Sequence, residues 1–125
     1  MLYTQEEKAK IYENLDRIKE CLEMLQPRVR ERITVDFGEM KTYASWDRER
    51  EYHLYLSKDT ISGRSGGLGL DYTRERVSSS TRSTVYQHFD YAVALIKNWQ
   101  YIKRTILSKL EEQNETLAAI NNFEV

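Results

Sequence analysis

The chain has 125 residues, of which 40% are hydrophobic, and its 19 Lys and Arg face 20 Asp and Glu, which gives a formal net charge of −1. This composition is typical of one soluble globular domain over residues 1–125; it excludes a disordered chain and argues against a general nucleic-acid coat. No stretch approaches the roughly 20 apolar residues of a membrane-spanning helix. No signal peptide is visible, and the single cysteine is Cys21. We therefore expect a cytoplasmic protein with no membrane partner and with Cys21 as a reduced thiol.

Positive charge is concentrated in the middle of the chain. Residues 28–104 carry fourteen Lys and Arg against ten Asp and Glu, whereas residues 1–27 carry four against six and residues 105–125 carry one against four. Ten of the fourteen are Arg, the side chain that makes two parallel hydrogen bonds with a phosphate or a carboxylate. An anionic partner is therefore expected at the middle of the chain, and a salt-bridged surface is the alternative.

The first predicted element is a helix over residues 5–25. Thr4 and Glu7 have the spacing of a capping box, and Pro27 ends the helix. The apolar residues step by four and three along one face: Ile11, Leu15, Ile18, Leu22 and Leu25. This face is expected to pack in the core, with a coiled-coil contact as the alternative.

The next part of the chain has the two-residue period of β-strands. Strands are predicted at about 29–37, 40–46 and 51–57, with a possible fourth at 68–73, and Gly38 is interpreted as the turn between the first two. They form an antiparallel meander of three to four strands with one apolar face. Helices that cover this face would complete an α+β domain.

The last part of the chain combines an irregular segment with a long helix. Residues 58–83 are predicted to be a loop rich in Gly, Ser and Arg, and residues 84–122 a helix that begins with a second capping box at Thr84 and Gln87. A continuous helix of this length would extend beyond a compact body. We therefore expect either a break near residues 112–114 or a homo-oligomer, a dimer or higher, that forms through this helix.

The predicted loop contains the groups that an anion site needs. Glycines let backbone amides approach a phosphate, arginines neutralise it, and the start of the following helix would point free amides at the same place. A tyrosine could stack a base, and a histidine one turn into the helix could donate a hydrogen bond to a phosphate. The predicted ligand-binding residues are Arg64, Gly66, Gly67, Gly69, Tyr72, Arg74, Arg76, Arg82 and His88. The alternative is a surface loop whose arginines are solvated.

Two other sets of residues could bind an anion or a base. The first is a ladder of strand arginines, which could instead pair with carboxylates on neighbouring strands: Arg28, Arg30 and Arg32. The second is a set of tyrosine rings on the sheet face away from the core, where a base could stack with an arginine above it: Tyr43, Tyr55 and Tyr72. Trp46 and Trp99 share the apolar phase of their elements and are expected in the core or an interface.

No residue pattern indicates catalysis. His53 and His88 are the only histidines, and neither has the spacing of a metal ligand to Cys or a carboxylate. Cys21 has Glu20 and Glu23 close by, which disfavours a reactive thiolate. We expect no enzyme, no metal and no cofactor.

The overall plan resembles a group of viral proteins. Its features are a capped N-terminal helix, a small sheet rich in Tyr and Arg, and a long ending that runs from residues 94–99 through 120–123. In size and plan the chain is similar to small accessory proteins of phages and prophages that antagonise bacterial immunity. Among these, the anti-Thoeris sponges are compact oligomers that sequester cyclic ADP-ribose-type signalling nucleotides without cleaving them, and anti-CRISPR proteins form another group.

The resemblance implies a non-enzymatic, phage-encoded protein of the host cytoplasm. It would sequester a phosphate-bearing small molecule such as a cyclic signalling nucleotide. One alternative is an inhibitor that binds a host immune protein or a nucleoprotein complex. The other is a structural protein whose role is oligomerisation.

Overall fold

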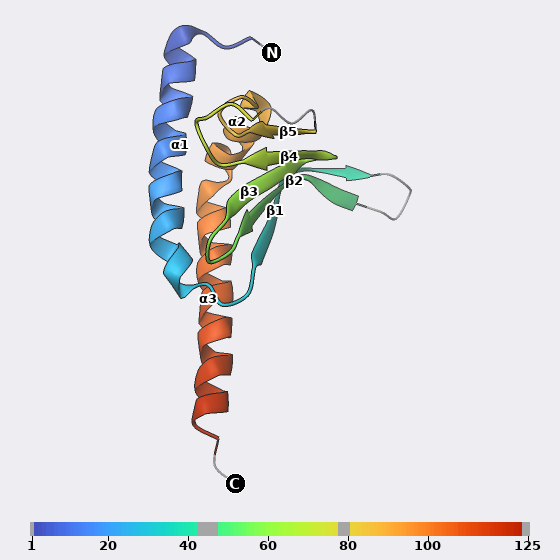
Figure 1. Ribbon diagram of the computed structural model, residues 1–125. Coiled ribbons are helices and arrows are strands. Elements are labelled where there is room, and N and C mark those ends of the chain that lie inside the picture. Colours follow the sequence, from blue (N-terminus) through green and yellow to red (C-terminus); the bar gives the residue numbers. More distant parts are fainter. Residues whose placement is uncertain (1, 43–47, 78–80, 124–125) are drawn as a thin grey trace.

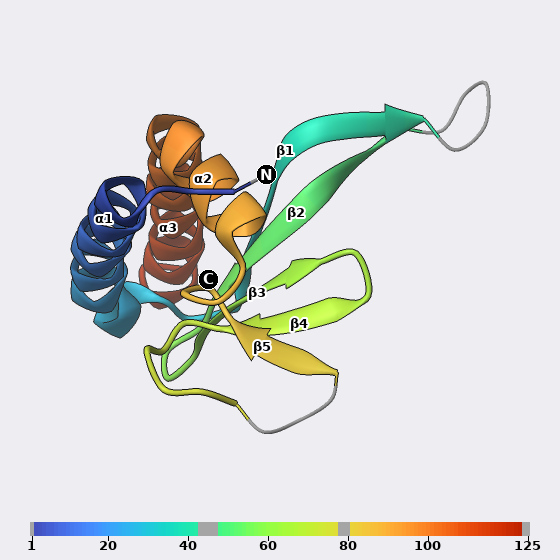
Figure 2. The ribbon, with the colours of Figure 1, turned by 90° about the horizontal axis from the view of Figure 1, so that it is seen from above.

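The computed structural model describes residues 2–42, 48–77 and 81–123 and has an α+β fold (Figure 1). A mixed five-stranded sheet has the strand order β1-β2-β3-β4-β5, and the helices pack on one of its faces (Figure 2). The elements are α1 (Gln5–Leu25), η1 (Gln26–Arg28), β1 (Ile33–Thr42), β2 (Arg48–Leu56), β3 (Ile61–Ser65), β4 (Leu68–Asp71), β5 (Arg82–Thr84), α2 (Phe89–Lys97) and α3 (Trp99–Asn121). None of the helices in the described ranges is long and apolar enough to cross a membrane.

The prediction of the first helix is confirmed, including its capping box. The amide of Glu7 donates to Thr4 Oγ1 at 3.1 Å, and the amide of Thr4 donates to Glu7 Oε1 at 2.9 Å. The apolar face of α1 lies in the core, since Ile11, Leu15, Ile18 and Leu22 are buried. The coiled-coil alternative is therefore not needed to explain it.

The interpretation of Gly38 as a turn is wrong. β1 continues through this position, and the pairing with β2 shifts register between Phe37 and Met40, which marks a β-bulge. Gly38 has φ +90°, and a Cβ atom built on it would lie 2.6 Å from Cδ2 of Tyr52. A bulge and a turn both favour glycine at positive φ, so the two look alike in sequence. The predicted strand 40–46 is the outer part of β1 as far as Thr42, and residues 43–46 lie outside the described residues.

The possible fourth strand at 68–73 is confirmed as β4, but the rest of the predicted loop over residues 58–83 also contains strands, and the sheet has five strands and is mixed rather than antiparallel with three to four. β3 and β4 form a hairpin that turns at Gly66 and Gly67, and β5 pairs parallel to β4. Glycines occupy several positions of these strands, and because glycine has no side chain, the alternation of apolar and polar residues is not visible in the sequence. At Gly63 a Cβ atom would lie 2.2 Å from the hydroxyl oxygen of Tyr91, so the close approach of α2 requires glycine there.

The long C-terminal helix begins later and breaks earlier than predicted. Thr84 ends β5, its hydroxyl is buried without a hydrogen-bond partner in the described structure, and α2 begins at Phe89. The break lies at Asn98, whose side-chain amide donates to the carbonyl of Ala94 at 2.8 Å, and residues 112–114 lie inside α3. A one-residue interruption leaves the spacing of apolar residues almost unchanged, which is why the sequence pattern did not reveal it.

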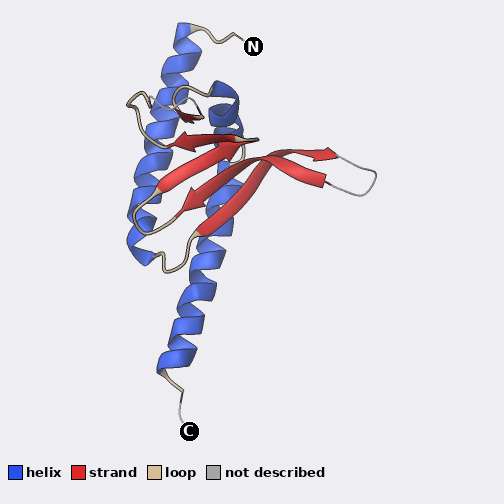
Figure 3. Cartoon of the chain, turned by 45° about the vertical axis from the view of Figure 1, so that its right-hand side comes forward, coloured by secondary structure: helices blue, strands red, loops and turns tan. Residues whose placement is uncertain are grey.

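The core lies between the inner face of the sheet and the three helices (Figure 3). The sheet contributes Ile33, Val35, Phe37, Leu54, Leu56 and Leu70, and the helices contribute Leu15, Leu22, Tyr91, Leu95, Ile102 and Ile106. Tyr91 is fully buried, and its hydroxyl donates to the carbonyl of His53 at 2.7 Å. α2 is thereby positioned against β2 and β3.

We expect Gly63→Ala to lower the free energy of unfolding by about 1–3 kcal/mol, the usual range for overpacking a core. The added methyl group would push against the Tyr91 hydroxyl and the carbonyl of His53, 2.9 Å away. The matched control is Gly67→Ala, since a Cβ atom there has nothing within 4 Å. That variant should change stability by less than about 0.5 kcal/mol. Urea unfolding of both variants checks the prediction, and equal losses would contradict it.

Candidate functional site

The structure does not bring the nine predicted ligand-binding residues together. The sheet surface holds Arg64, Gly69 and Arg82, and the turn of the β3–β4 hairpin holds Gly66 and Gly67. Tyr72 lies in the core, the segment after β4 holds Arg74 and Arg76, and His88 lies at the start of α2.

Two of the four predicted arginines already bind carboxylates of the chain. Arg74 forms a two-pronged ion pair with Asp16 on α1, in which Nε lies 3.1 Å from Oδ1, and the hydroxyl of Tyr86 donates to the same oxygen at 2.6 Å. The Arg74 guanidinium holds the pKa of Asp16 below its usual value. Arg82 forms an ion pair with Asp71, which raises the pKa of its guanidinium. These two arginines therefore stabilise the fold and offer little free charge to a phosphate.

Tyr72 and His88 also have structural roles. Tyr72 is 5% exposed, and its hydroxyl donates to the carbonyl of Leu15 at 2.6 Å. Burial raises the pKa of this phenol, and a ring in the core has no free face for a base. His88 caps α2, since its Nδ1 accepts from the amide of Tyr91 at 3.3 Å.

The helices leave one face of the sheet uncovered (Figure 2). Side chains alternate along a strand, so the neighbours of the buried residues Val35, Leu54 and Leu70 point to this side. We call this surface the open face, and it comprises Thr34, Asp36, His53, Tyr55, Ser62, Arg64, Gly69, Asp71 and Arg82.

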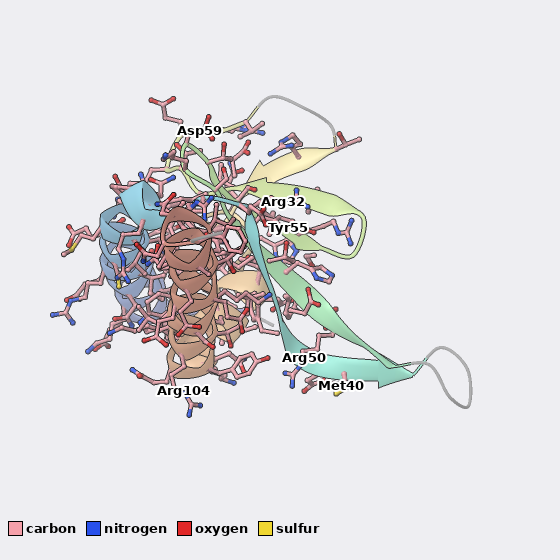
Figure 4. All side chains as sticks on the ribbon, turned by 90° about the horizontal axis from the view of Figure 1, so that it is seen from below. Arg32, Met40, Arg50, Tyr55, Asp59 and Arg104 are labelled. Atoms are coloured by element: carbon pink, nitrogen blue, oxygen red, sulfur yellow. The ribbon has the colours of Figure 1, made fainter. Side chains whose placement is uncertain are left out.

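The open face carries an aromatic platform flanked by arginines. The guanidinium carbon of Arg32 lies 4.9 Å from the ring centroid of Tyr55 (Figure 4). The rings of Tyr55 and His53 are nearly parallel at 12°, with centroids 6.3 Å apart, and Arg64 pairs directly across from His53. The predicted arrangement of a tyrosine with an arginine above it thus occurs at Tyr55, whereas Tyr72 is buried and Tyr43 lies outside the described residues.

The predicted ladder of strand arginines is not formed. Arg28 ends η1, and Arg30 and Arg32 precede β1, so none of the three lies in a strand, although Arg32 borders the open face at Tyr55. The Arg30 guanidinium instead donates to the carbonyl of Gln113 on α3 at 3.0 Å.

A second basic and aromatic surface lies where the edge strand β1 meets α3; we call it the edge groove. The part of the edge groove between β1, β2 and α3 has a volume of about 430 Å³ and is lined by Thr34, Val35, Asp36, Met40, Arg50, His53, Tyr101, Thr105 and Lys109. A hollow of about 420 Å³ continues along α3 and adds Arg104. Because Asp36 and His53 belong to both surfaces, the edge groove is continuous with the open face.

The side chains of the edge groove repeat the pairing of an aromatic ring with an arginine. The guanidinium carbon of Arg50 lies 5.4 Å from the ring centroid of Tyr101, and Figure 4 shows Arg50 beside Met40 on the strands. Lys109 donates to the carbonyl of Thr34 at 2.9 Å. Sequence reasoning missed this surface because Arg50 and Tyr101 belong to elements far apart in the chain.

A cleft between the outer part of the sheet and α2 has the opposite charge. It measures about 530 Å³, and its ionisable lining comprises Glu39, Glu51, Asp90 and Lys97 together with Tyr3 and Tyr52. Burial and then the Glu51 carboxylate raise the pKa of Tyr52. Three carboxylates against one ammonium group disfavour an anionic ligand in this cleft.

No protein-family model matches the chain, and neither a curated protein nor a solved structure gives a match. Within the described ranges, no group of three or more His, Cys, Asp or Glu could hold a metal ion.

The ion pair of Asp16 with Arg74 predicts a specific pH dependence of stability. The pKa of Asp16 is lowered on folding, so its contribution is fully present above the unfolded pKa of about 3.9 and is lost as the pH falls through the folded value. Asp16→Asn should therefore be less stable than wild type at pH 7, and the difference should shrink in acid. Urea unfolding between neutral pH and pH values below the unfolded pKa checks this. A difference independent of pH would show that the carboxylate charge does not matter, and Arg74→Gln should give the same convergence.

Proposed function

We propose that the chain is a non-catalytic binding protein that holds single-stranded nucleic acid on its open face. A base stacks on Tyr55, and adjacent phosphates bind Arg32 and Arg64. The observation that carries the proposal is the position of the Arg32 guanidinium, 4.9 Å from the Tyr55 ring on a sheet face without a helix above it.

Stacking and charge both favour this ligand. Stacking a base on an aromatic side chain contributes about 1–3 kcal/mol and tolerates any sequence. The Arg32 guanidinium, 4.9 Å from the Tyr55 ring, leaves no room for a base between them. A bound base therefore takes its place on the ring, and the guanidinium makes two hydrogen bonds with the adjacent phosphate. Single strands expose base faces that a duplex hides, so a flat aromatic platform selects the single strand.

The charges on the open face leave two arginines available. Asp36 contacts His53, with 2.5 Å between Oδ1 and Nδ1, and Asp71 binds Arg82. Within the described part of the chain, Arg32 and Arg64 have no carboxylate partner. These two residues lie on either side of the Tyr55–His53 pair, where the phosphates of a bound strand would run.

The edge groove gives the strand a path beyond the platform. It joins the open face at Asp36 and His53 and offers a second ring, Tyr101, under Arg50. Arg104 and Lys109 add positive charge farther along α3. The proposed binding path therefore has two positions that each combine one aromatic ring with one arginine, which would suit a ligand of several nucleotides.

Sequestration of a phosphate-bearing small molecule, such as a cyclic signalling nucleotide, is the second candidate. One ring and two arginines would suffice to bind a single nucleotide, which favours this second candidate. The open shape of the platform and the acidic character of the 530 Å³ cleft weigh against it. A phage-encoded anti-defence role is compatible with either ligand: a signalling nucleotide removed from solution, or a nucleic acid shielded from a host complex.

The platform predicts how variants bind a labelled single-stranded oligonucleotide of about 12 nucleotides, a length that an ssDNA-binding domain of this size covers. Tyr55→Ala should raise the dissociation constant by about 5- to 150-fold, the loss of one stacked base. Arg32→Gln should weaken binding and lower the slope of log K against log salt by about 0.7, the share of one phosphate on a single strand. Fluorescence anisotropy at several salt concentrations measures both effects.

The matched control is Arg17→Gln, because Arg17 is exposed on α1 in the helix layer. That variant should bind like wild type. Equal affinity of the wild type and Tyr55→Ala would exclude the platform as the site.

Chain length separates the two candidate ligands. Strand binding predicts that affinity rises from a mononucleotide to longer oligonucleotides as more phosphates and bases engage. Sequestration predicts tight one-to-one binding of a cyclic nucleotide and no gain with length. Isothermal titration with mononucleotides, cyclic nucleotides and oligonucleotides of increasing length distinguishes them.

A further inference from the structure

The C-terminal end of α3 projects beyond the rest of the protein (Figures 1 and 3). Its last link to the body is Gln113, whose side chain accepts from the amide of Arg30 and donates to the carbonyl of Glu31, both at 2.9 Å. Among the described residues, no hydrogen bond or ion pair joins residues 114–123 to another element. We call residues 114–123 the extension.

The extension has an apolar face. Ile102, Ile106 and Leu110 are buried against the body, and the same helical stripe continues at Leu117 and Ile120. Ile120 is 64% exposed and Phe123, just past the helix, 74%. The carboxylates near the extension lie on the other side of the helix: Glu111, Glu112 and Glu115. Because the extension lies beyond the body, its apolar face has no packing partner among the described residues.

The surface at the base of the extension has the complementary character. Arg28 and Arg30 are exposed there and have no carboxylate partner among the described residues. The base therefore offers positive charge, whereas the extension ends at the negative end of a helix dipole.

We propose that a second copy of this chain covers the extension, with the two extensions packed antiparallel about a twofold axis. Leu117 of each copy faces Ile120 of the other, which brings Phe123 of each copy beside Asn114 of the other. The C-terminal end of each α3 then meets Arg28 and Arg30 of the other copy. Such an interface is isologous and closes at a dimer. Because the glutamates lie on the opposite side of the helix, the packing does not bring them together. The dimer does not depend on the proposed nucleic-acid function.

Sedimentation velocity over a range of protein concentrations tests the dimer. Wild type should sediment as a dimer, and the double variant Leu117→Glu with Ile120→Glu should sediment as a monomer with an unchanged urea midpoint for the body. The double variant Ala118→Glu with Ala119→Glu introduces the same charge away from the apolar face and should remain dimeric. Replacing both Arg28 and Arg30 with Glu should raise the dimer dissociation constant at least about tenfold. A wild type that stays monomeric at all concentrations, or a double variant that stays dimeric, would overturn the proposal.

Cross-linking tests the antiparallel arrangement. In a Cys21→Ser background, mixing an Asn114→Cys variant with a Phe123→Cys variant should give a disulfide-linked heterodimer under mild oxidation. Efficient disulfide formation by the Phe123→Cys variant alone would place the two ends together and would exclude the antiparallel packing.

Discussion

The buried hydroxyl of Tyr91 determines how the helices sit on the sheet. A phenol in the core must find an acceptor, and the carbonyl of His53 is the one it reaches, through the space that Gly63 leaves open. The same ring packs edge-on against Phe37 and Tyr52, with centroids 5.3 and 5.6 Å away. One side chain thus ties α2 to β1, β2 and β3. Because the Tyr91 side chain packs against the inner side of β2, it also helps to position His53 and Tyr55, which point from the same strand to the open face.

Local signals explain the part of the fold that the sequence predicted correctly. The capping box of Thr4 and Glu7 and the apolar spacing of α1 act within a few residues, so a linear reading captures them. The α+β class follows from the change of period after Pro27. The errors arise where distant packing decides the conformation. The bulge at position 38 requires glycine because the Tyr52 ring packs against it. The strand position 63 requires glycine because the Tyr91 hydroxyl lies against it.

The same distinction separates the site predicted from the sequence from the surface proposed from the structure. Arg74 and Arg82 were expected to bind a phosphate, but Asp16 and Asp71 neutralise them, and Asp16 comes from α1. Tyr55 was predictable from strand alternation alone. The pairing of Arg50 with Tyr101 was not, since it depends on how α3 passes the edge of the sheet. A count of arginines in a segment therefore overstates its free charge, because the carboxylates that bind them can come from anywhere in the chain.

The position of Lys109 has a consequence for the behaviour of the protein in concentrated solution. β1 is an edge of the sheet, and the unpaired carbonyl groups of an edge strand invite a strand from another molecule. Lys109 places an ammonium group on one of them, the carbonyl of Thr34, and α3 runs beside the same edge. At the other edge, β5 has only three residues. The bulge at Gly38 and the Lys109 side chain interrupt the template that β1 offers, and β5 is short, so both edges disfavour the addition of a strand from another molecule.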